Sequence, residues 1–331
     1  MRFFDYIHKK RLLLCAVLTL LTIGAVSFLL ARPEEEPLAE SRFMLDTICT
    51  VTLYEWEGDG SAILNGAFDL CAEYEKRLSA TVKGSDIDKI NHSDGKPVSV
   101  TGETAALLQN ALRYCALSGG QFDITIYPVK SLWDFNGEPP SLPDAATLRE
   151  AAARVDYTLM TIDGTSVSLP KGMGVDLGAI AKGYIADRVK EYLTAEGVIS
   201  AIIDLGGNIY ALGRRPDGEL WRVGIRKPFS DEEADVVETA DASVVTSGVY
   251  QRYFKTGGRL YHHILRASDG MPCDSGLSSV TVIAESSEMC DALSTVCMLV
   301  GYEQSVKLLT QFPGTRAVFI TDDYQLKYFD Q

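Results

Sequence analysis

The longest uncharged run of the chain covers residues 12–31, between the basic cluster 9–11 and Arg32. As a helix at 1.5 Å per residue, these twenty residues span about 30 Å, the thickness of a bilayer core. The basic cluster precedes the run, so the positive-inside rule predicts a cytoplasmic tail over 1–11 and a single transmembrane anchor over 12–31. The rest of the chain would then lie outside the cell membrane. A cleaved signal peptide is the alternative, with a weak cleavage site at 25–27.

The acidic, proline-containing segment at 32–42 is predicted to be a linker. The chain after it shows helical periodicity in several places. Apolar residues recur every three to four positions in six later segments, the pattern of an amphipathic helix. These predicted helices cover 62–78, 104–117, 143–155, 179–195, 287–300 and 302–311. Gly119 and Gly120 follow the second helix as a C-terminal stop signal.

Alternating and β-branched segments predict strands between these helices. They cover 48–56, 157–162, 166–169, 200–204, 279–284, 316–321 and 325–329. The pair around Asp163 and Gly164 reads as a hairpin, and short strands with glycine turns fill 208–265. Helices and strands do not alternate in a strict β-α-β order, so we expect the α+β class for the part of the chain after the linker.

The charge balance narrows the choice of ligands. The chain of 331 residues has a formal net charge of −14, and the basic N-terminal 31 residues carry +3, which leaves −17 for the remaining 300. Such a surface disfavours nucleic-acid binding. The seven cysteines show no C-x-x-C pair and no zinc spacing, and the sequence cannot pair them as disulfides.

The segment VDLGAIAKGY at 175–184 contains small residues at the start of a predicted helix. Small side chains let a ligand approach the helix N-terminus, where the dipole favours anions. Lys182 lies one turn in and could reach a phosphate, while Asp176 could cap the helix or bind a ligand group. The alternative is a capped helix that uses its glycines for close packing.

A second candidate is the segment DALST at 291–295 in an otherwise apolar helix. Asp291 and Thr295 are four positions apart and therefore share a face, with Ser294 beside them. A carboxylate with hydroxyl groups suggests a site for a hard cation such as Mg²⁺. A buried aspartate that hydrogen-bonds to threonine is the alternative.

Two further segments carry residues of chemical interest. His262 and His263 lie in a predicted strand after the TSG segment at 246–248, and neighbouring strand residues face opposite sides. One histidine could therefore face a cleft as a general base, although a strand histidine can also be purely structural. The aromatic side chains of the segment GQFDITIYP at 120–128, together with Trp133 and Phe135, could form a wall of the site. They could equally belong to the hydrophobic core.

Together and in this order, these segments resemble the ApbE family, the FAD:protein FMN transferases, over about residues 43–330. The motifs that carry the resemblance are LS at 78–79, SDIDKIN at 85–91, GQFDIT at 120–125 with Pro128 and Trp133, VDLGAIAKGY at 175–184, DLGG at 204–207, VTSG at 245–248, HIL at 263–265, SVTV at 279–282 and DALST at 291–295. The resemblance implies mixed sheets flanked by helices, related to T-folds. It also implies Mg²⁺-dependent transfer of FMN from FAD to a Thr or Ser hydroxyl of a target protein, with release of AMP.

The resemblance also implies partners and site residues. The targets would be FMN-binding-domain proteins or subunits of membrane redox complexes, and the enzyme would sit outside the membrane on its anchor. His263 resembles the proposed base. The metal would be held by the Ala179 carbonyl, Asp291 and Thr295, with Ser294 beside them. The residues implied for the flavin nucleotide are Leu45, Thr81, Gln121, Phe122, Asp123, Asp176, Lys182 and Ile264.

The chain departs from the family pattern in three places. Residues 45–47 are Leu-Asp-Thr where family members often have Met-Gly-Thr, and Thr81 replaces an aromatic residue that stacks on the nucleotide in some members. The segment after His263 lacks the usual Asp-Pro. Because of these changes, the sequence does not show which side chain stacks on the nucleotide. None of them removes an implied metal ligand. Two other functions stay as alternatives: an FAD pyrophosphatase that uses water as acceptor, and a non-catalytic membrane-tethered FAD-binding protein.

Overall fold

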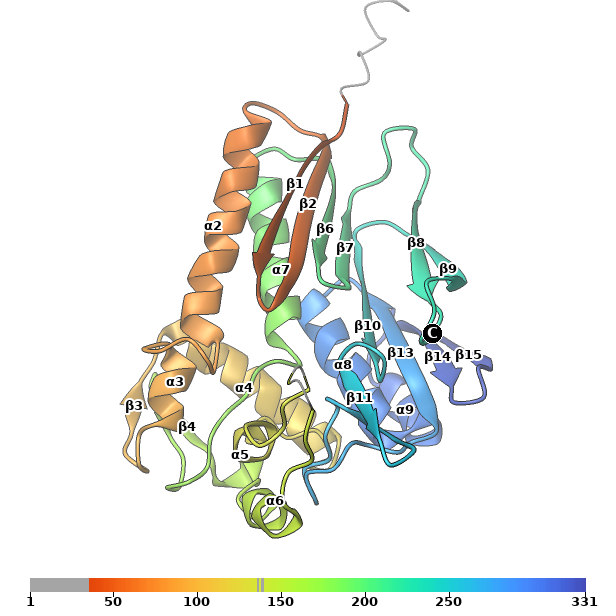
Figure 1. Cartoon of the computed structure of the whole chain (residues 1–331). Helices are drawn as coiled ribbons and strands as arrows, with labels where there is room; N and C mark the ends of the chain where they lie inside the picture. The colour runs from red at the N-terminus through yellow and green to blue at the C-terminus, as the bar shows by residue number, and fades with distance from the viewer. Residues whose placement is uncertain (1–35, 136, 138–139) are drawn as a thin grey trace, which may run out of the picture. The chain divides into compact units, whose positions relative to one another are not determined.

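An eight-stranded antiparallel sheet is the central element of the computed structural model, which describes residues 36–135, 137 and 140–331 (Figure 1). Its strand order is β1-β2-β6-β7-β10-β13-β14-β15. The strands are β1 (Leu38–Met44), β2 (Thr47–Glu55), β6 (Ser200–Leu205), β7 (Asn208–Leu212), β10 (Ala242–Gly248), β13 (Leu277–Ala284), β14 (Arg316–Thr321) and β15 (Leu326–Asp330). Strands from both halves of the chain therefore meet in one sheet.

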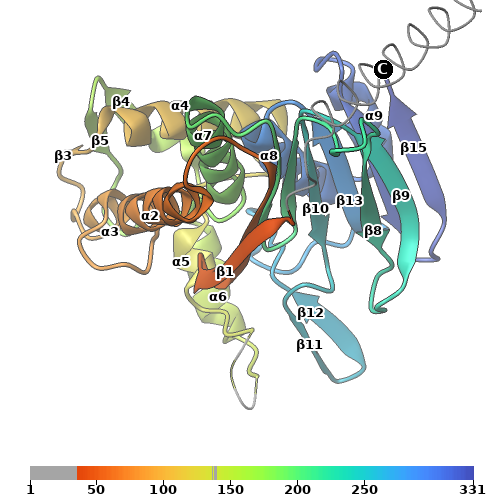
Figure 2. The same cartoon turned by 90° about the horizontal axis from the view of Figure 1, so that it is seen from above.

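Helices α2, α7 and α8 lie on one side of this sheet, and a ribbon of β8 and β9 lies on the other (Figure 2). The helices are α2 (Gly60–Leu78), α3 (Asp86–Asn91), α4 (Gly102–Leu117), α5 (Tyr127–Lys130), α6 (Ala145–Ala152), α7 (Ala181–Ala195), α8 (Ser287–Val300) and α9 (Tyr302–Leu309). A short 3₁₀ helix, η1, covers Tyr157–Leu159. The main core fills the space between the helices and the sheet, and a smaller cluster lies under the β8–β9 ribbon.

Three small sheets complete the fold. Their strands are β3 (Val98–Ser99), β4 (Thr161–Asp163) and β5 (Ser166–Ser168) in the first, β8 (Trp221–Arg226) and β9 (Glu233–Thr239) in the second, and β11 (Tyr253–Thr256) and β12 (Arg259–His262) in the third. All paired strands are antiparallel, and the parallel contact seen among the described residues is an isolated bridge between Ile126 and Gly174. The α+β class is confirmed, but the sheets are not mixed in direction.

Most predicted elements are present with small shifts of their ends. The helix predicted at 287–300 and the strand predicted at 316–321 match α8 and β14 residue for residue. The long helices also match because their apolar stripes are regular. The six described cysteines are all buried and free, so they serve as small core residues.

Three predictions of element position are wrong. Residues 38–42, assigned to a linker, belong to β1, which pairs with β2 over its whole length. Its alternation is masked by the neighbouring acidic and proline residues. The helix predicted from residue 179 begins at Ala181, and the strand predicted at 157–162 is η1 followed by the three-residue β4.

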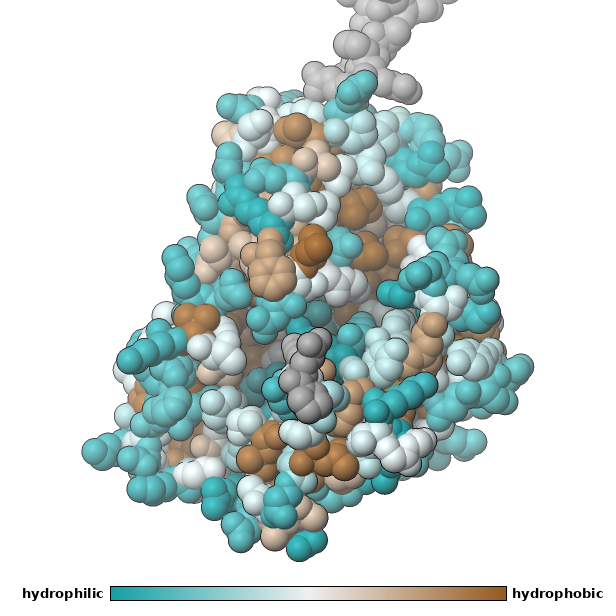
Figure 3. Space-filling model, viewed as in Figure 1, coloured by the Kyte–Doolittle hydropathy of each residue, from teal (hydrophilic) through white to brown (hydrophobic). Residues whose placement is uncertain are grey.

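No helix in the described part of the chain has the length and apolar character needed to cross a bilayer. The predicted cytoplasmic tail at 1–11 and anchor at 12–31 lie outside the described residues. On the face shown in Figure 3, the surface is hollowed between the β1–β2 hairpin and the β8–β9 ribbon.

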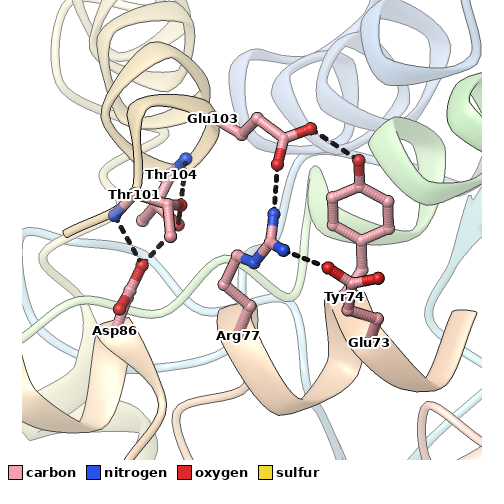
Figure 4. A network of polar contacts seen from close by, with 7 residues as sticks. All are labelled: Glu73, Tyr74, Arg77, Asp86, Thr101, Glu103 and Thr104. Atoms are coloured by element: carbon pink, nitrogen blue, oxygen red, sulfur yellow. Dashed lines mark hydrogen bonds and ion pairs between the residues drawn. The ribbon is translucent and has the colours of Figure 1, made fainter. Parts of the chain in front are cut away.

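A polar network ties α2 to the start of α4 and holds α3 nearby (Figure 4). The Glu103 carboxylate accepts a hydrogen bond of 2.7 Å from the Tyr74 hydroxyl. The Asp86 carboxylate accepts one of 2.9 Å from the Thr101 N–H, which fixes α3 against the first turn of α4. The loop between α2 and α3, which contains Thr81, is therefore anchored at both ends.

Candidate active site

Helices α7 and α8 each supply a carboxylate to the N-terminal backbone of the other. Asp291 of α8 accepts a hydrogen bond of 2.9 Å from the Gly183 N–H in the first turn of α7. Asp187 of α7 accepts from the Ser287 and Glu288 N–H groups at 2.8 and 3.0 Å. The first N–H groups of a helix lack partners inside the helix and carry the positive end of its dipole. These two contacts therefore hold the helices in one register.

Gly183 allows the close approach of these two helices. A Cβ atom at this position would lie 2.2 Å from the Ser287 carbonyl oxygen and 2.7 Å from the Asp291 Cβ. The packing interpretation of the small residues is thus confirmed at Gly183. It does not compete with a ligand role for the neighbouring residues, since the packing is what brings Asp291 to the start of α7.

We expect Gly183→Ala to lower the free energy of unfolding by about 1–3 kcal/mol, because the added methyl group must push α8 away. Urea unfolding followed by circular dichroism measures this change. Gly102→Ala is the matched control, since nothing lies within 4 Å of a Cβ added at the first residue of α4. That substitution should be neutral or stabilise by up to about 1 kcal/mol. Equal losses in the two variants would contradict the packing argument.

The same contact leaves the Ala179 carbonyl without a helical partner. In a regular helix, the N–H of residue 183 would donate to the carbonyl four positions earlier. Here the Gly183 N–H donates to Asp291, and no N–H of the described residues donates to the Ala179 oxygen. The next bond, from the Tyr184 N–H to the Ile180 carbonyl, is intact at 3.1 Å. The Ala179 carbonyl and the Asp291 carboxylate therefore both lie at the start of α7, and both are oxygen ligands of the kind that a hard cation prefers.

Hydroxyl groups extend this set along α8. The Ser294 and Thr295 hydroxyls each share a hydrogen bond with the Ser247 hydroxyl of β10, at 2.8 and 3.0 Å. The Ser294 hydroxyl also contacts the Asp291 carbonyl at 3.0 Å. Ser247 was not among the predicted site residues, because it lies 47 positions before Ser294 and only the β10–α8 packing joins them.

The charge of Asp291 lacks a full partner. Burial raises the pKa of this carboxyl, and the nearby Lys182 ammonium and the Gly183 N–H offset that rise only in part. Among the described residues, no group of three or more His, Cys, Asp or Glu side chains is placed to hold a metal ion. The available donors are therefore one carboxylate, one carbonyl and hydroxyls. Such an all-oxygen set fits Mg²⁺, which commonly takes one or two carboxylates and keeps several waters.

The Lys182 ammonium acts on this carboxylate through its charge but forms no ion pair with it. It is half-buried in the first turn of α7, and no carboxylate of the described residues lies within ion-pair distance of its ammonium group. Its charge also reaches Cys49 on β2, where burial nonetheless raises the thiol pKa to about 12. An unpaired ammonium beside a helix N-terminus is suited to an anionic ligand.

One interpretation of the sequence was that Asp176 caps α7. The structure shows no such cap. The Asp176 carboxylate accepts two hydrogen bonds from the Lys130 ammonium, at 2.7 and 2.8 Å, and one of 2.9 Å from the Gly178 N–H. The Asn91 side chain holds the preceding residue, Val175, through its N–H and carbonyl at 2.6 and 2.9 Å. The segment before α7 is therefore fixed by α3 and α5.

The predicted nucleotide segment 121–123 lies beside this segment, because the Asp176 N–H donates to the Ile124 carbonyl at 2.8 Å. The Asp123 carboxylate is buried and accepts from the Thr125 N–H and hydroxyl, both at 2.7 Å, and from the Tyr157 N–H at 2.9 Å. Its side chain thus shapes the loop. Phe122 is buried and Gln121 is exposed.

His262 and His263 are adjacent but differ in hydrogen bonding. The Nδ1 atom of His262 accepts from the Ile264 N–H at 3.3 Å, so its Nε2–H donates to the Cys273 carbonyl at 3.1 Å. The sequence did not show which of the two histidines is structural, and these hydrogen bonds identify it as His262. The Nδ1 atom of His263 is buried and has no partner among the described residues.

The surroundings of His263 keep its ring neutral. Burial is the main reason that the pKa of His263 is lowered to about 3, and the charges of His262, Arg252 and Lys130 contribute to the same shift. A neutral imidazole can accept a proton, which a base requires. Lys130, which binds Asp176, therefore lies within electrostatic reach of the histidine. Ile264, predicted to contact the nucleotide, is buried directly after it.

The tip of the β1–β2 hairpin reaches the same region. Leu45 and Asp46 have φ angles of 54° and 57°, as a two-residue hairpin turn of type I′ requires. The Leu45 N–H donates to Glu75 at 2.9 Å, and the Asp46 carbonyl accepts from the Arg252 guanidinium at 3.3 Å. Because the Arg252 carbonyl accepts the His263 N–H at 3.2 Å, Arg252 joins the hairpin tip to the candidate base.

The structure thus links most of the predicted residues through side chains that spacing did not find, namely Lys130, Ser247 and Arg252. Thr81 contacts only its own loop through Ser79, and neither Thr81 nor Gln121 is joined to the other candidates by a hydrogen bond within the described residues. A groove of about 500 Å³ lies elsewhere, between the β8–β9 ribbon and β15, and no candidate residue lines it.

Comparisons with known proteins confirm the family resemblance that the motifs indicated. A family model described as the ApbE family matches residues 45–319. A curated protein of Treponema pallidum (strain Nichols) called FAD:protein FMN transferase is 38% identical over 319 residues, which cover 90% of this chain and 87% of that protein. The crystal structure of the ApbE protein of Thermotoga maritima superposes with a TM-score of 0.81 at 28% identity, covering 88% of this chain and 96% of that one. The flavin transferase ApbE of Vibrio cholerae gives 0.80 at 27% identity, with coverages of 89% and 96%.

Proposed function

This chain belongs to the ApbE family, and we propose from that membership that it is an FAD:protein FMN transferase. The reaction moves FMN from FAD to a Thr or Ser hydroxyl of an acceptor protein. The hydroxyl oxygen bonds to the phosphorus of the FMN half, the pyrophosphate P–O bond breaks, and AMP leaves. The hydroxyl proton is transferred to a base.

The buried Asp291 carboxylate is the observation that carries this proposal. Taking a charge out of water is costly unless a counter-charge compensates it. Asp291 has no ion pair within the described part of the chain, and its raised pKa reflects that cost. A carboxylate held this way by Gly183, beside an unpaired Ala179 carbonyl, supports a cation site on the two helices.

Mg²⁺ would be held there by the Ala179 carbonyl, Asp291 and Thr295, with Ser294 and Ser247 beside them. Bound Mg²⁺ supplies positive charge that stabilises the charge developing on the pyrophosphate oxygens. The protein contributes the fixed positions of these donors, because α7 and α8 cap each other.

FAD would be bound by residues on both sides of the α7 start. The unpaired Lys182 ammonium is suited to a phosphate, and the Lys130–Asp176 pair presents a charged group on the adjoining segment. The loop at 121–123 and Ile264 form neighbouring surfaces. The hairpin residue Leu45 and the loop residue Thr81 would border the nucleotide.

His263 would remove the proton of the incoming hydroxyl. Its free Nδ1 atom has no competing partner among the described residues, and its ring is neutral at neutral pH. The charges of a bound pyrophosphate would raise its pKa toward neutral pH, which favours proton acceptance.

The acceptor and the location follow from the same proposal. An FMN-binding-domain protein or a subunit of a membrane redox complex is the acceptor that fits this reaction. The uncharged run at 12–31 supports a membrane anchor with the catalytic domain outside the cell membrane.

Incubation of the purified protein with FAD, MgCl₂ and an FMN-binding-domain protein tests the function. Transfer yields a flavin-fluorescent acceptor band in a denaturing gel and one AMP per labelled acceptor. AMP with free FMN and no labelled acceptor would instead identify a pyrophosphatase. Bound FAD without any AMP would identify a non-catalytic binding protein.

We also expect MgCl₂ to raise the melting temperature more at about pH 8 than at about pH 5. The pKa of Asp291 is raised in the folded state, so the stability that its neutral form provides is lost as pH rises through that pKa. Metal binding offsets this loss, whereas protons compete with the metal at low pH. Thermal unfolding with MgCl₂ or EDTA measures the difference, and a pH-independent shift would argue against Asp291 as a ligand.

A further inference from the structure

Strand β10 lies beside α8 (Figure 1), and a chain of three hydroxyl groups joins the two elements. The Ser247 hydroxyl contacts the Ser294 hydroxyl at 2.8 Å and the Thr295 hydroxyl at 3.0 Å. The Ser294 hydroxyl also donates to the Asp291 carbonyl at 3.0 Å. Neither Ser247 nor Thr295 makes another side-chain hydrogen bond among the described residues. The three contacts therefore form one chain that ends at the Asp291 carbonyl.

The direction of this chain follows from the number of protons available. A hydroxyl group has one proton to donate, and a carbonyl oxygen can only accept. The Ser294 proton is used on the Asp291 carbonyl, so the Ser294 oxygen must accept from Ser247. The Ser247 proton is then used as well, so Thr295 must be the donor in its contact with Ser247. All three hydroxyl protons are thus directed along the chain toward the Asp291 carbonyl.

This direction leaves the lone pairs of the Thr295 hydroxyl oxygen free. No group in the described part of the chain donates a hydrogen bond to that oxygen. A cation binds a hydroxyl oxygen through its lone pairs and repels its proton, so a hydroxyl ligand needs an acceptor for that proton on the side away from the cation. The Ser247 oxygen is such an acceptor.

Burial distinguishes Thr295 from the other two hydroxyl residues. Ser294 is 0% exposed and Ser247 is 8% exposed, whereas Thr295 is only partly buried. A hydrated ion needs accessible surface, which the Ser294 side chain lacks. Asp291 and Thr295 lie one turn apart on the same face of α8. Thr295 is therefore the hydroxyl residue that can share a cation with Asp291, and the two serines lie behind it.

Resting on the transferase function proposed above, we propose that Ser247 is a positioning residue of the metal site, which accepts the Thr295 hydroxyl proton and thereby turns the Thr295 lone pairs toward Mg²⁺. Ser294 sets the direction of the chain by accepting the Ser247 proton. Ser247 pairs with Val280 of β13 in the interior of the large sheet, which makes it a rigid support. Residues that hold a metal ligand in this way typically contribute about 10–100-fold to metal affinity.

Ser247→Ala removes the proton acceptor and leaves every proposed ligand in place. The melting temperature across an MgCl₂ series, without FAD, gives the Kd for the metal. We expect this Kd to rise about 10-fold, because the Thr295 proton loses its acceptor and competes with the cation. The MgCl₂ concentration for half-maximal FMN transfer should rise by a similar factor. The rate at saturating MgCl₂ and the KM for FAD should stay within about 2-fold of normal.

Ser243→Ala is the matched control. Ser243 lies four residues earlier on the same face of β10, is fully buried, and donates to the Ser287 hydroxyl of α8 at 2.8 Å. This variant also loses a hydroxyl contact between β10 and α8, but Ser287 is not a proposed ligand. The two metal-free variants should therefore show similar falls in melting temperature, while Ser243→Ala keeps the Kd for Mg²⁺ within about 2-fold. Equal Kd values in the two variants would overturn the positioning role.

A double variant tests whether Ser247 acts through Thr295. Valine has the shape of threonine without the hydroxyl, so Thr295→Val removes the ligand itself. In that background, Ser247→Ala should raise the Kd for Mg²⁺ by less than about 2-fold, compared with about 10-fold alone. An equal increase in both backgrounds would show that Ser247 acts independently of Thr295, against the proposal.

The same measurements separate this inference from the proposed function. If MgCl₂ stabilises the unaltered protein, FMN is transferred and Ser247→Ala keeps the normal Kd, the positioning role alone fails. If the unaltered protein neither responds to MgCl₂ nor labels an acceptor, the transferase function fails together with the metal site.

Discussion

Asp291→Asn is expected to lower the rate of FMN transfer by about 10²–10³-fold while the protein stays folded. The asparagine side-chain oxygen can still accept the Gly183 N–H, which preserves the contact between α7 and α8. Its neutral amide cannot supply the negative charge that a divalent cation needs. Steady-state assays of AMP release across a MgCl₂ series measure the loss.

Stability measurements separate this loss from unfolding. Because burial raises the pKa of Asp291, its ionised form destabilises the metal-free fold at neutral pH, and the neutral amide removes that cost. The metal-free variant should therefore melt at the same temperature as the unaltered protein or higher, without the stabilisation by MgCl₂. Full Mg²⁺-dependent activity in Asp291→Asn would exclude the metal assignment.

Asp187→Asn is the control within the same helix pair. Asp187 accepts the Ser287 and Glu288 N–H groups at the start of α8, and an amide can replace only part of this charge-assisted cap. We expect a loss of about 1–2 kcal/mol in the free energy of unfolding. The response to MgCl₂ should remain, since Asp187 is not a proposed ligand.

His263→Gln is expected to lower transfer by about 10²–10³-fold, the usual contribution of a general base. Binding of FAD, measured by flavin fluorescence, should change little, because the substitution removes a proton acceptor and leaves Lys182 in place. A variant that transfers FMN at the normal rate would show that another group accepts the proton.

His262→Gln gives the contrasting result. Its ring bridges the Ile264 N–H and the Cys273 carbonyl, so the change should lower the free energy of unfolding by about 1–3 kcal/mol. The rate per folded molecule should stay within a few-fold of normal. The two adjacent histidines thus separate stability from catalysis.

The pH dependence of stability also distinguishes His263. Its folded pKa of about 3 lies below the ordinary value of about 6.5, so its neutral ring contributes stability above about pH 6.5 that is lost as pH falls toward 3. A glutamine side chain cannot titrate, so the His263→Gln variant should lose less stability over that range. Urea unfolding at several pH values measures the difference.

The long elements were predictable because their signals are local. α8 shows an apolar stripe that begins after a serine cap and ends at Gly301, and β14 is a short β-branched run. β1 was not predicted because its residues alternate only weakly between polar and apolar. Its strand conformation depends on its pairing with β2. The start of α7 was displaced because Asp291, 108 positions away, takes the N–H that would have extended the helix.

The α+β class, the C-terminal ends of the long helices and the types of residue in the site could be predicted from the sequence alone, because they depend on local periodicity and on the order of the motifs. The tertiary structure decided how those residues act. It assigned the Gly183 N–H to Asp291 and so freed the Ala179 carbonyl, paired Asp176 with Lys130, and left one of two adjacent histidines with a free nitrogen. These outcomes depend on burial and on hydrogen bonds between distant segments, and neither follows from local spacing.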